Sequence, residues 1–199
     1  MTMRTPKLRE LKEAVTALIR GPYTAKFPAE PTPLAEAFRG APRFDEDECV
    51  GCGACANVCP TGALEMTDDA ESATRRLVIR FDRCIFCGQC VLNCLTEKGV
   101  AQTNEYDLST TDRSTLRETV EKRLLICEGC GAVIGAEDHV KWVADRLGPL
   151  AFSNPTLLLT ALQDLGLADK APPAGEDLRR GDRVRVLCPK CRQVTSLVV

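Results

Sequence analysis

Hydrophobic positions at helical spacing open the chain. One apolar stripe runs along residues 1–20, the opposite face is charged, and Gly21-Pro22 is typical of a helix end. The stripe consists of Leu8, Leu11, Val15, Leu18 and Ile19. Prolines then recur as far as Pro42, which indicates an extended arm that lies along a partner. We therefore expect residues 1–42 to form an amphipathic helix and a docking arm.

An alternation of apolar and polar residues with a period of two appears next and predicts a β-hairpin. Its strands are Ala63 to Met66 and Leu77 to Phe81, joined by a polar turn over residues 68–71. Farther along, Leu116, Val120 and Leu124 recur every four residues, which predicts a connecting helix over residues 112–125.

The last part of the chain is expected to mix helices and strands. Helices are predicted at residues 137–147 and 155–165, the second with Asn154 as its cap, Pro155 at its first position and Gly166 just past its end. Short strands are predicted at residues 183–187 and 194–199.

Twelve cysteines among 199 residues change this ordinary picture, because such an excess indicates disulfides or metal. The first residues are rich in Lys and Arg and lack an apolar run of signal-peptide length, so we expect a cytoplasmic chain with reduced thiols that bind metal. No stretch approaches the roughly 20 apolar residues that span a bilayer. Any membrane association is therefore expected to be peripheral.

The formal charge of −2 treats every cysteine as neutral. Metal binding deprotonates thiols, and three sites of four thiolates each would bring the total to about −8. So negative a holoprotein is a poor nucleic-acid binder, and no nucleic-acid partner is expected.

Eight of the cysteines form two runs with the spacing C-x2-C-x2-C-x3-C, which amounts to an internal repeat. Three closely spaced cysteines can wrap one face of a 4Fe-4S cubane, and in two-cluster ferredoxins the last cysteine of each run ligates the other cluster. The spacing thus predicts one cluster on Cys49, Cys52, Cys55 and Cys94, and a second on Cys84, Cys87, Cys90 and Cys59. The predicted fold class is α+β, with a two-cluster bacterial-type ferredoxin domain over residues 43–108.

Other residues of the two runs suit this interpretation. Gly51, Gly53 and Gly88 permit the dihedrals of backbone wrapped around a cluster. Val50, Ile85 and Phe86 either exclude water from the clusters or simply pack in the core. Cys59 is followed by Pro60, as in the usual ferredoxin cysteine motif, whereas Cys94 is followed by Leu95. Zinc sites or a disulfide lattice are disfavoured, because structural zinc prefers separated C-x2-C pairs.

A second cysteine set forms two such pairs far apart in the sequence: Cys127, Cys130, Cys188 and Cys191. Two knuckles supply the four thiolates that zinc prefers, and a rubredoxin-like iron or a further cluster remains the alternative. His139, the only histidine, is expected to lie on the surface of a helix. Residues 109–199 are therefore predicted to form a zinc-ribbon-like domain with a helical insertion.

With these motifs in place, the chain resembles the ferredoxin-type iron-sulfur subunit of energy-converting membrane-bound nickel-iron hydrogenases and formate hydrogenlyase, itself similar to the two-cluster subunit of respiratory complex I. The resemblance is carried by Arg39-Gly40-Ala41-Pro42, Asp47-Glu48 before Cys49, the two cysteine runs, Glu105-Tyr106-Asp107-Leu108, and the knuckles at Cys127 and Cys188. The knuckles favour the hydrogenase branch.

The resemblance implies a non-catalytic electron-transfer subunit of an oxidoreductase complex, without an active site of its own. Implied partners are a soluble electron-input module, hydrogenase- or complex I-like small and large subunits, and a membrane subunit that receives the N-terminal helix. The alternatives are a freely diffusing two-cluster ferredoxin, and a nucleic-acid or assembly module using Arg179, Arg180, Arg183 and Arg185. If residues 183–187 form a strand, those arginines would instead mark its solvated face. For the N-terminal helix, the alternative to docking on a partner is that it caps the chain's own ferredoxin core.

Overall fold

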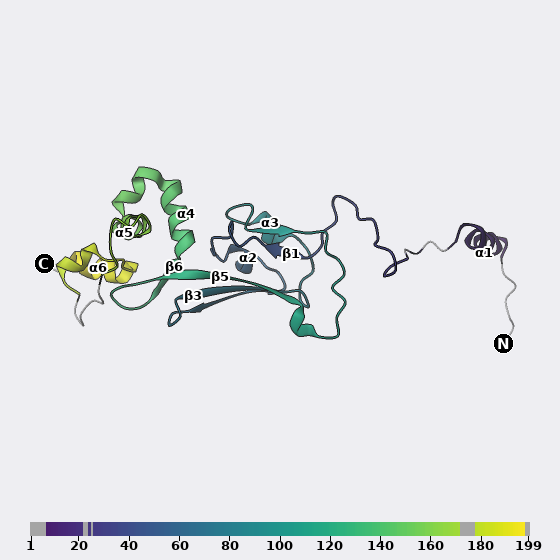
Figure 1. Cartoon of the computed structure of the whole chain (residues 1–199), viewed down its shortest axis with the longest axis horizontal. Helices are drawn as coiled ribbons and strands as arrows, with labels where there is room; N and C mark the ends of the chain where they lie inside the picture. The colour runs from purple at the N-terminus through teal and green to yellow at the C-terminus, as the bar shows by residue number, and fades with distance from the viewer. Residues whose placement is uncertain (1–6, 22–23, 25, 172–177, 198–199) are drawn as a thin grey trace. The chain divides into compact units, whose positions relative to one another are not determined.

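The computed structural model of the chain describes residues 7–21, 24, 26–171 and 178–197. It divides into two compact units, Met1–Phe38 and Arg39–Val199 (Figure 1).

The first unit contains the predicted amphipathic helix, α1, which spans Leu8–Arg20. The Glu10 carboxylate accepts from the Lys7 N–H over 3.0 Å at its beginning, and Gly21, with φ of 82°, ends it. No residue of α1 is buried, and Leu8 and Leu18 are 87% and 86% exposed. The described residues between α1 and Pro42 contain no helix or strand, as expected for the arm.

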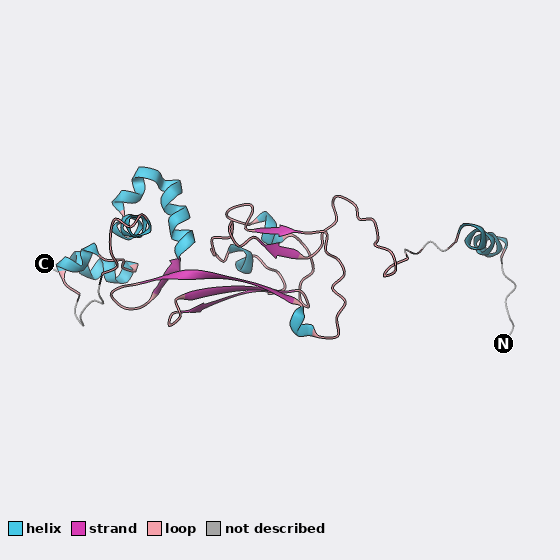
Figure 2. Cartoon of the chain, in the orientation of Figure 1, coloured by secondary structure: helices cyan, strands magenta, loops and turns pink. Residues whose placement is uncertain are grey.

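The second unit contains a two-stranded and a four-stranded antiparallel sheet (Figure 2). The smaller sheet pairs β1 (Pro42–Phe44) with β4 (Val100–Gln102). The larger sheet has the order β2, β3, β5, β6, with the bounds Leu64–Asp69, Thr74–Arg80, Arg117–Ile126 and Val133–Ala136. The predicted hairpin is therefore confirmed as β2 and β3, with Leu64 opposite Ile79.

The two cysteine runs lie on the same side of the larger sheet as β1 and β4 (Figure 1). Each run contains a single helical turn, α2 (Ala54–Asn57) in the first and α3 (Gln89–Leu92) in the second. The core beneath them is formed by Ala41, Cys55, Leu64, Ile79, Phe81 and Val100. Burial of these apolar groups, at roughly 25 cal/mol per Å², fixes the runs against the sheet.

Two segments that flank the cysteine runs in the sequence meet in space. Gly40 N–H donates to the Thr103 carbonyl over 2.9 Å, and Ala41 N–H donates to that of Glu105 over 2.8 Å. A β-carbon on Gly40 would lie 2.5 Å from each of these two carbonyl oxygens. Only glycine allows this approach, which closes the ferredoxin core.

The helix predicted over residues 112–125 is wrong, because this segment forms the short 3-10 turn η1 (Arg113–Thr115) followed by strand β5. Apolar residues four apart share a face in a strand as well as in a helix. The positions between them on the inward face hold Glu118 and Lys122, whose side chains are only 16% and 10% exposed because they are ion-paired. The alternation of apolar and polar residues that marks a strand is therefore absent from the sequence, because charged residues occupy two of the inward positions.

The helices predicted at residues 137–147 and 155–165 are confirmed as α4 (Glu137–Leu147) and α5 (Pro155–Asp164), separated by the 3-10 turn η2 (Gly148–Ser153). The Asn154 side chain accepts from the Thr156 N–H over 3.0 Å, as expected of its cap. These helices gather near the end of the sheet where β5 and β6 pair (Figure 2).

The two strands predicted near the C-terminus are wrong. Residues Arg180–Val184 form a 3-10 turn, η3, and Pro189–Leu197 form helix α6; residues 198–199 lie outside the described part. Pro189 stands at the first helical position, where its fixed φ favours a helix. Arg183 then donates from Nε and Nη2 to the carbonyls of Thr195 and Ser196, over 3.0 and 2.9 Å, and so satisfies the last turn of α6.

Candidate metal centres

Two small cavities, of about 20 Å³ each, lie beside the cysteine runs. One is lined by Cys84, Cys87 and Cys90 of the second run together with Cys59, the last cysteine of the first. The other is lined by Cys49, Cys52 and Cys55 together with Cys94, the last cysteine of the second run. The structure therefore brings together the same two sets of four that the spacing assigns to the two clusters.

The backbone turns around each cavity in the same way. Gly53 and Gly88 each precede a helical turn with φ of 77° and 78°, in the left-handed region that favours glycine. Gly51 has φ of 67°, and Phe86, at the same place in the second run, has φ of 53°. The expected unusual dihedrals are thus present, and at Phe86 a large side chain adopts one.

The three apolar residues between cysteines differ in exposure. Ile85 is 60% exposed, whereas Val50 and Phe86 are half-buried. Ile85 and Phe86 line the cavity of Cys84, Val50 lines the cavity of Cys49, and Phe86 also packs against the core. All three apolar side chains therefore lie where they can exclude water, and Ile85 also presents part of its side chain to the surface.

Burial governs the thiols deepest in the cavities. It raises the pKa of Cys55 to about 12, with a further contribution from the Cys52 and Cys49 thiols. Burial likewise raises the pKa values of Cys49, Cys84 and Cys90. Iron must displace these protons, because thiolates are the ligating form.

The fourth cysteine of each run lies in a different environment. Burial would raise the pKa of Cys59, but hydrogen bonds from the Leu64, Thr61 and Ala63 backbone N–H groups and the Thr61 hydroxyl outweigh it and lower the pKa. Thr61 Oγ1 lies 3.7 Å from Cys59 Sγ.

Cys94 repeats this arrangement. Burial would raise the pKa of Cys94, but hydrogen bonds from the Thr96 hydroxyl and from the N–H groups of Thr96, Val100 and Gly99 outweigh this effect and lower the pKa. Thr96 Oγ1 lies 3.5 Å from the Cys94 sulfur. A threonine two residues after each last cysteine was a sequence signal that the spacing analysis missed. Four thiols with N–H groups aimed at sulfur suit a 4Fe-4S cluster.

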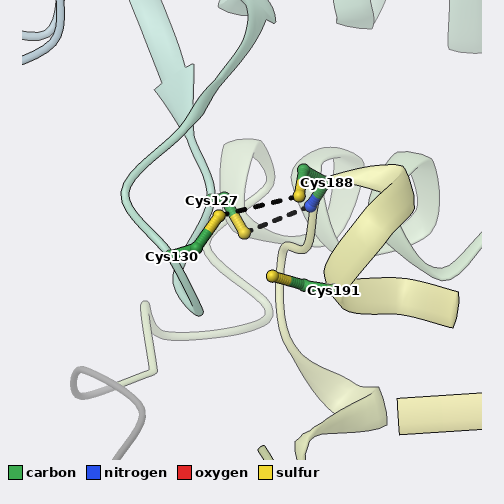
Figure 3. Close-up of side chains that lie close together, drawn as sticks. All are labelled: Cys127, Cys130, Cys188 and Cys191. Carbon is green, nitrogen blue, oxygen red and sulfur yellow. Dashed lines mark hydrogen bonds between the residues drawn. The ribbon is translucent and has the colours of Figure 1, made fainter. Parts of the chain in front are cut away.

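A third group of cysteines converges at the other end of β5. The sulfur atoms of Cys127, Cys130, Cys188 and Cys191 all lie within 4.8 Å of one another (Figure 3). The first two follow β5 in a tight turn, with Gly131 N–H donating to the Cys127 carbonyl over 2.9 Å, and the last two lie at the beginning of α6. The structure thus joins knuckles that are far apart in the sequence.

Hydrogen bonds prepare one of these thiols for metal. Burial would raise the pKa of Cys127, but N–H groups of Cys188, Cys130 and Gly129 outweigh it and lower the pKa to about 7. Of these, the Cys188 N–H lies 3.2 Å from the Cys127 sulfur (Figure 3). Four sulfurs at this separation fit a single ion with tetrahedral ligands. Only the first knuckle is flanked by strands, so the likeness to a zinc ribbon is limited to the knuckle pair and the β5–β6 hairpin.

The remaining candidate residues have other roles. His139 lies on α4 as predicted but is half-buried, and burial followed by the charge of Arg75 lowers its pKa. Arg183 binds the α6 carbonyls, and Arg185 pairs with Asp182 over 2.6 Å. The prediction of a solvated arginine face on a strand is therefore wrong, because Arg183 and Arg185 lie on a 3-10 turn and next to it and bind groups of this chain.

Comparison with known proteins decides the family. Residues 48–98, which contain all eight cysteines of the two runs, match the 4Fe-4S dicluster domain family. A subunit named NADH-quinone oxidoreductase subunit I 2, from Geobacter metallireducens, is 30% identical over 132 residues, covering 62% of this chain and 98% of the relative. The chain belongs to the subunit I family of NADH-quinone oxidoreductases.

Two other members of this wider group confirm the resemblance found in the sequence. NAD(P)H-quinone oxidoreductase subunit I of Gloeobacter violaceus is 35% identical over 102 residues, which cover 49% of this chain and 48% of the relative. Formate hydrogenlyase subunit 6 of Escherichia coli is 39% identical over 62 residues, 31% of this chain and 33% of the relative. The chain therefore spans half or less of the length of these two relatives.

Proposed function

We propose that this chain is the iron-sulfur electron-transfer subunit of a membrane-associated oxidoreductase complex, and that it relays electrons between a soluble oxidising module and a hydrogenase- or complex I-like small subunit. One observation carries the proposal: each of two cavities is lined by three cysteines of one run and the last cysteine of the other. Crossed lining of this kind is the arrangement of two-cluster ferredoxins.

The residues that would hold the first cluster are Cys49, Cys52, Cys55 and Cys94, and those that would hold the second are Cys84, Cys87, Cys90 and Cys59. When bound, each cluster supplies a one-electron carrier. The chain contributes the converging thiols, the N–H groups beside Cys59 and Cys94 that stabilise charge on sulfur, and the apolar packing of Val50 and Phe86.

Helix α1 supports assembly into a complex. Its apolar stripe is not covered by any other described part of its own unit, so the helix offers an apolar face for burial against another surface. We infer that the stripe rests on a membrane subunit or its interface, so that association with the membrane is peripheral. Within the described residues no helix has the length and apolar character needed to cross a bilayer.

For the cysteine group at Cys127 we propose structural zinc. Among the residues that the structure describes, four thiols and no other ligand type converge there, as in structural zinc sites. The ion would join the β5–β6 turn to α6, and would add to the packing of Leu187, Leu178 and Ile134 and to the hydrogen bonds between Glu128 and Val186. A single iron in the same sulfur set is the alternative, and metal analysis separates the two.

The test is anaerobic purification of the chain with and without its complex. We expect about eight irons per chain in clusters and one further metal, reduced-state EPR signals from two interacting 4Fe-4S centres, and co-purification with large and small oxidoreductase subunits. A chain with far fewer irons would refute the cluster assignment. A fully loaded chain that never binds other subunits would instead favour the freely diffusing ferredoxin.

A further inference from the structure

The two cysteine runs are held by different hydrogen-bond donors at the same place. Gly51 and Phe86 each precede the second cysteine of a run and share a left-handed backbone. The Gly51 carbonyl accepts from Nη1 of Arg75 over 2.8 Å, in a buried hydrogen bond. The Phe86 carbonyl accepts from Nε2 of Gln102 over 3.1 Å. A cation thus supports the first run where a neutral amide supports the second.

Arg75 keeps its charge inside the protein. It lies on the inward face of β3 and is 8% exposed. Its Nε and Nη2 bind the two carboxylate oxygens of Asp68, each over 2.7 Å, while Nη1 reaches Gly51. The guanidinium therefore lies between an acidic partner and the cysteine loop. Because the guanidinium is shielded from water, its electrostatic field at the cysteine loop is screened less than the field of a surface charge would be.

A second cation lies on the same side of the first run. The Lys122 side chain is 10% exposed and pairs with Asp138 over 3.3 Å. Its aliphatic part would lie 3.0 Å from a β-carbon on Gly51. Burial raises the pKa of the nearby Cys49 thiol, and the charge of Lys122 opposes that rise.

The second run has a cation too, but water screens it. Arg39 donates from Nη1 to the Cys87 carbonyl over 3.2 Å, in an exposed hydrogen bond. Because water and salt screen an exposed charge, Arg39 should stabilise negative charge on the second run only weakly. The asymmetry between the runs is therefore one of burial as well as of charge.

We propose that Arg75 makes the cluster held by Cys49, Cys52, Cys55 and Cys94 the more easily reduced of the two, so that an electron on this chain resides mainly there. The inference rests on the proposed function. Reduction adds one negative charge to a cluster, which a buried cation stabilises more than the Gln102 amide does. Arg75 thus acts on the cluster by its charge, from its place beside the Gly51 loop.

Redox titration of the anaerobic holoprotein, followed by EPR, tests this. The signals are first assigned with Cys94→Ala and Cys59→Ala. Arg75→Gln supplies the neutral donor found at the other run, and we expect it to shift the electron away from the first cluster by about tenfold, which corresponds to about 59 mV for one electron. Arg75→Lys should retain most of the wild-type distribution, and Arg39→Gln should leave it nearly unchanged.

Asp68→Asn separates electrostatics from folding. It removes the acidic partner but keeps the guanidinium, so it should move the first potential upward, opposite to Arg75→Gln. Loosening of the loop would instead move both variants in the same direction. Fully loaded variants with unchanged potentials, or shifts of equal sign, would overturn the role of Arg75 and leave the electron-transfer proposal standing, whereas missing iron in the wild-type chain would overturn that proposal itself.

Discussion

Arg43 and Glu118 form a partly buried ion pair that joins the beginning of the ferredoxin core to strand β5. The Glu118 carboxylate also accepts from the Phe44 N–H over 2.6 Å, and the guanidinium of Arg43 binds Glu105 and lies 5.2 Å from the centre of the Phe81 ring. The hydrogen bond to Glu118 is the main reason that the pKa of Arg43 is raised. One carboxylate thus links β1 to the larger sheet.

Replacing this carboxylate should destabilise the protein. Glu118→Gln weakens the pair with Arg43 and the bond to Phe44 N–H in a site where water replaces them poorly, and we expect a loss of about 1–3 kcal/mol. For a chain of this size that lowers the thermal midpoint by about 2–4 °C per kcal/mol. Circular dichroism of the anaerobic holoprotein measures it.

Glu121→Gln is the matched control on the same strand. Glu121 pairs with Arg76, but both side chains are more than half exposed, at 52% and 59%. Exposed pairs contribute about 0–1 kcal/mol. Equal midpoints for the two variants would show that the Arg43–Glu118 pair does not hold β1 to β5.

Crossed ligation predicts which cluster each last cysteine supports. Cys94→Ala should impair the cluster with Cys49, Cys52 and Cys55, although Cys94 is adjacent in sequence to the second run. The bound iron should fall from about eight to about four or five per chain. Iron analysis with EPR of the remaining cluster measures this, with Cys59→Ala as the reciprocal variant. Loss of the second cluster's signal on Cys94→Ala contradicts the crossed assignment.

A side chain at Gly53 would have to displace the Met66 side chain, which is 40% exposed. A β-carbon there would lie 2.5 Å from the Met66 sulfur, whereas one on Gly62 meets nothing within 4 Å. Both glycines have positive φ, 77° and 63°, so each alanine variant carries a backbone strain of about 1–2 kcal/mol. Gly53→Ala should therefore lose its iron chromophore faster than Gly62→Ala in denaturant, and equal rates would rule out the contact with Met66.

The cysteine group at Cys127 should bind metal independently of the two clusters. Cys191→Ser removes one of its four sulfurs, and we expect loss of about one metal per chain with both cluster EPR signals retained. Because the metal would join the β5–β6 turn to α6, limited proteolysis should then cut within residues 178–197. A variant that keeps its full metal content would show that this group is not the third site.

Helix α1 should matter for assembly and not for the clusters. Leu11→Glu with Leu18→Glu places charges in the exposed apolar stripe, which opposes burial against a partner surface. We expect full iron content but loss of co-purifying subunits. Glu13→Gln, on the charged face, should leave assembly unchanged. Loss of iron in the double variant would instead support a helix that caps its own core.

The sequence by itself determined the features whose causes are local. Cysteines spaced two or three residues apart indicate metal ligation from the local sequence, so the spacing alone predicts both runs and both knuckles. The hairpin β2–β3 and helices α4 and α5 follow from short-range patterns, and the Asn154 cap is satisfied by a neighbour two residues away. Such interactions need no knowledge of distant segments.

The tertiary structure decided the features whose causes lie far along the chain. The sequence predicts a helix in place of strand β5 because Glu118 and Lys122 stand at inward positions, and partners brought there by folding, among them Arg43 and Asp138, compensate for the burial of these charges. Helix α6 likewise depends on Arg183 binding its last carbonyls. Nor could spacing reveal that Arg75 supports one cysteine loop and Gln102 the other, because a charge acts through space and its partners are set by packing.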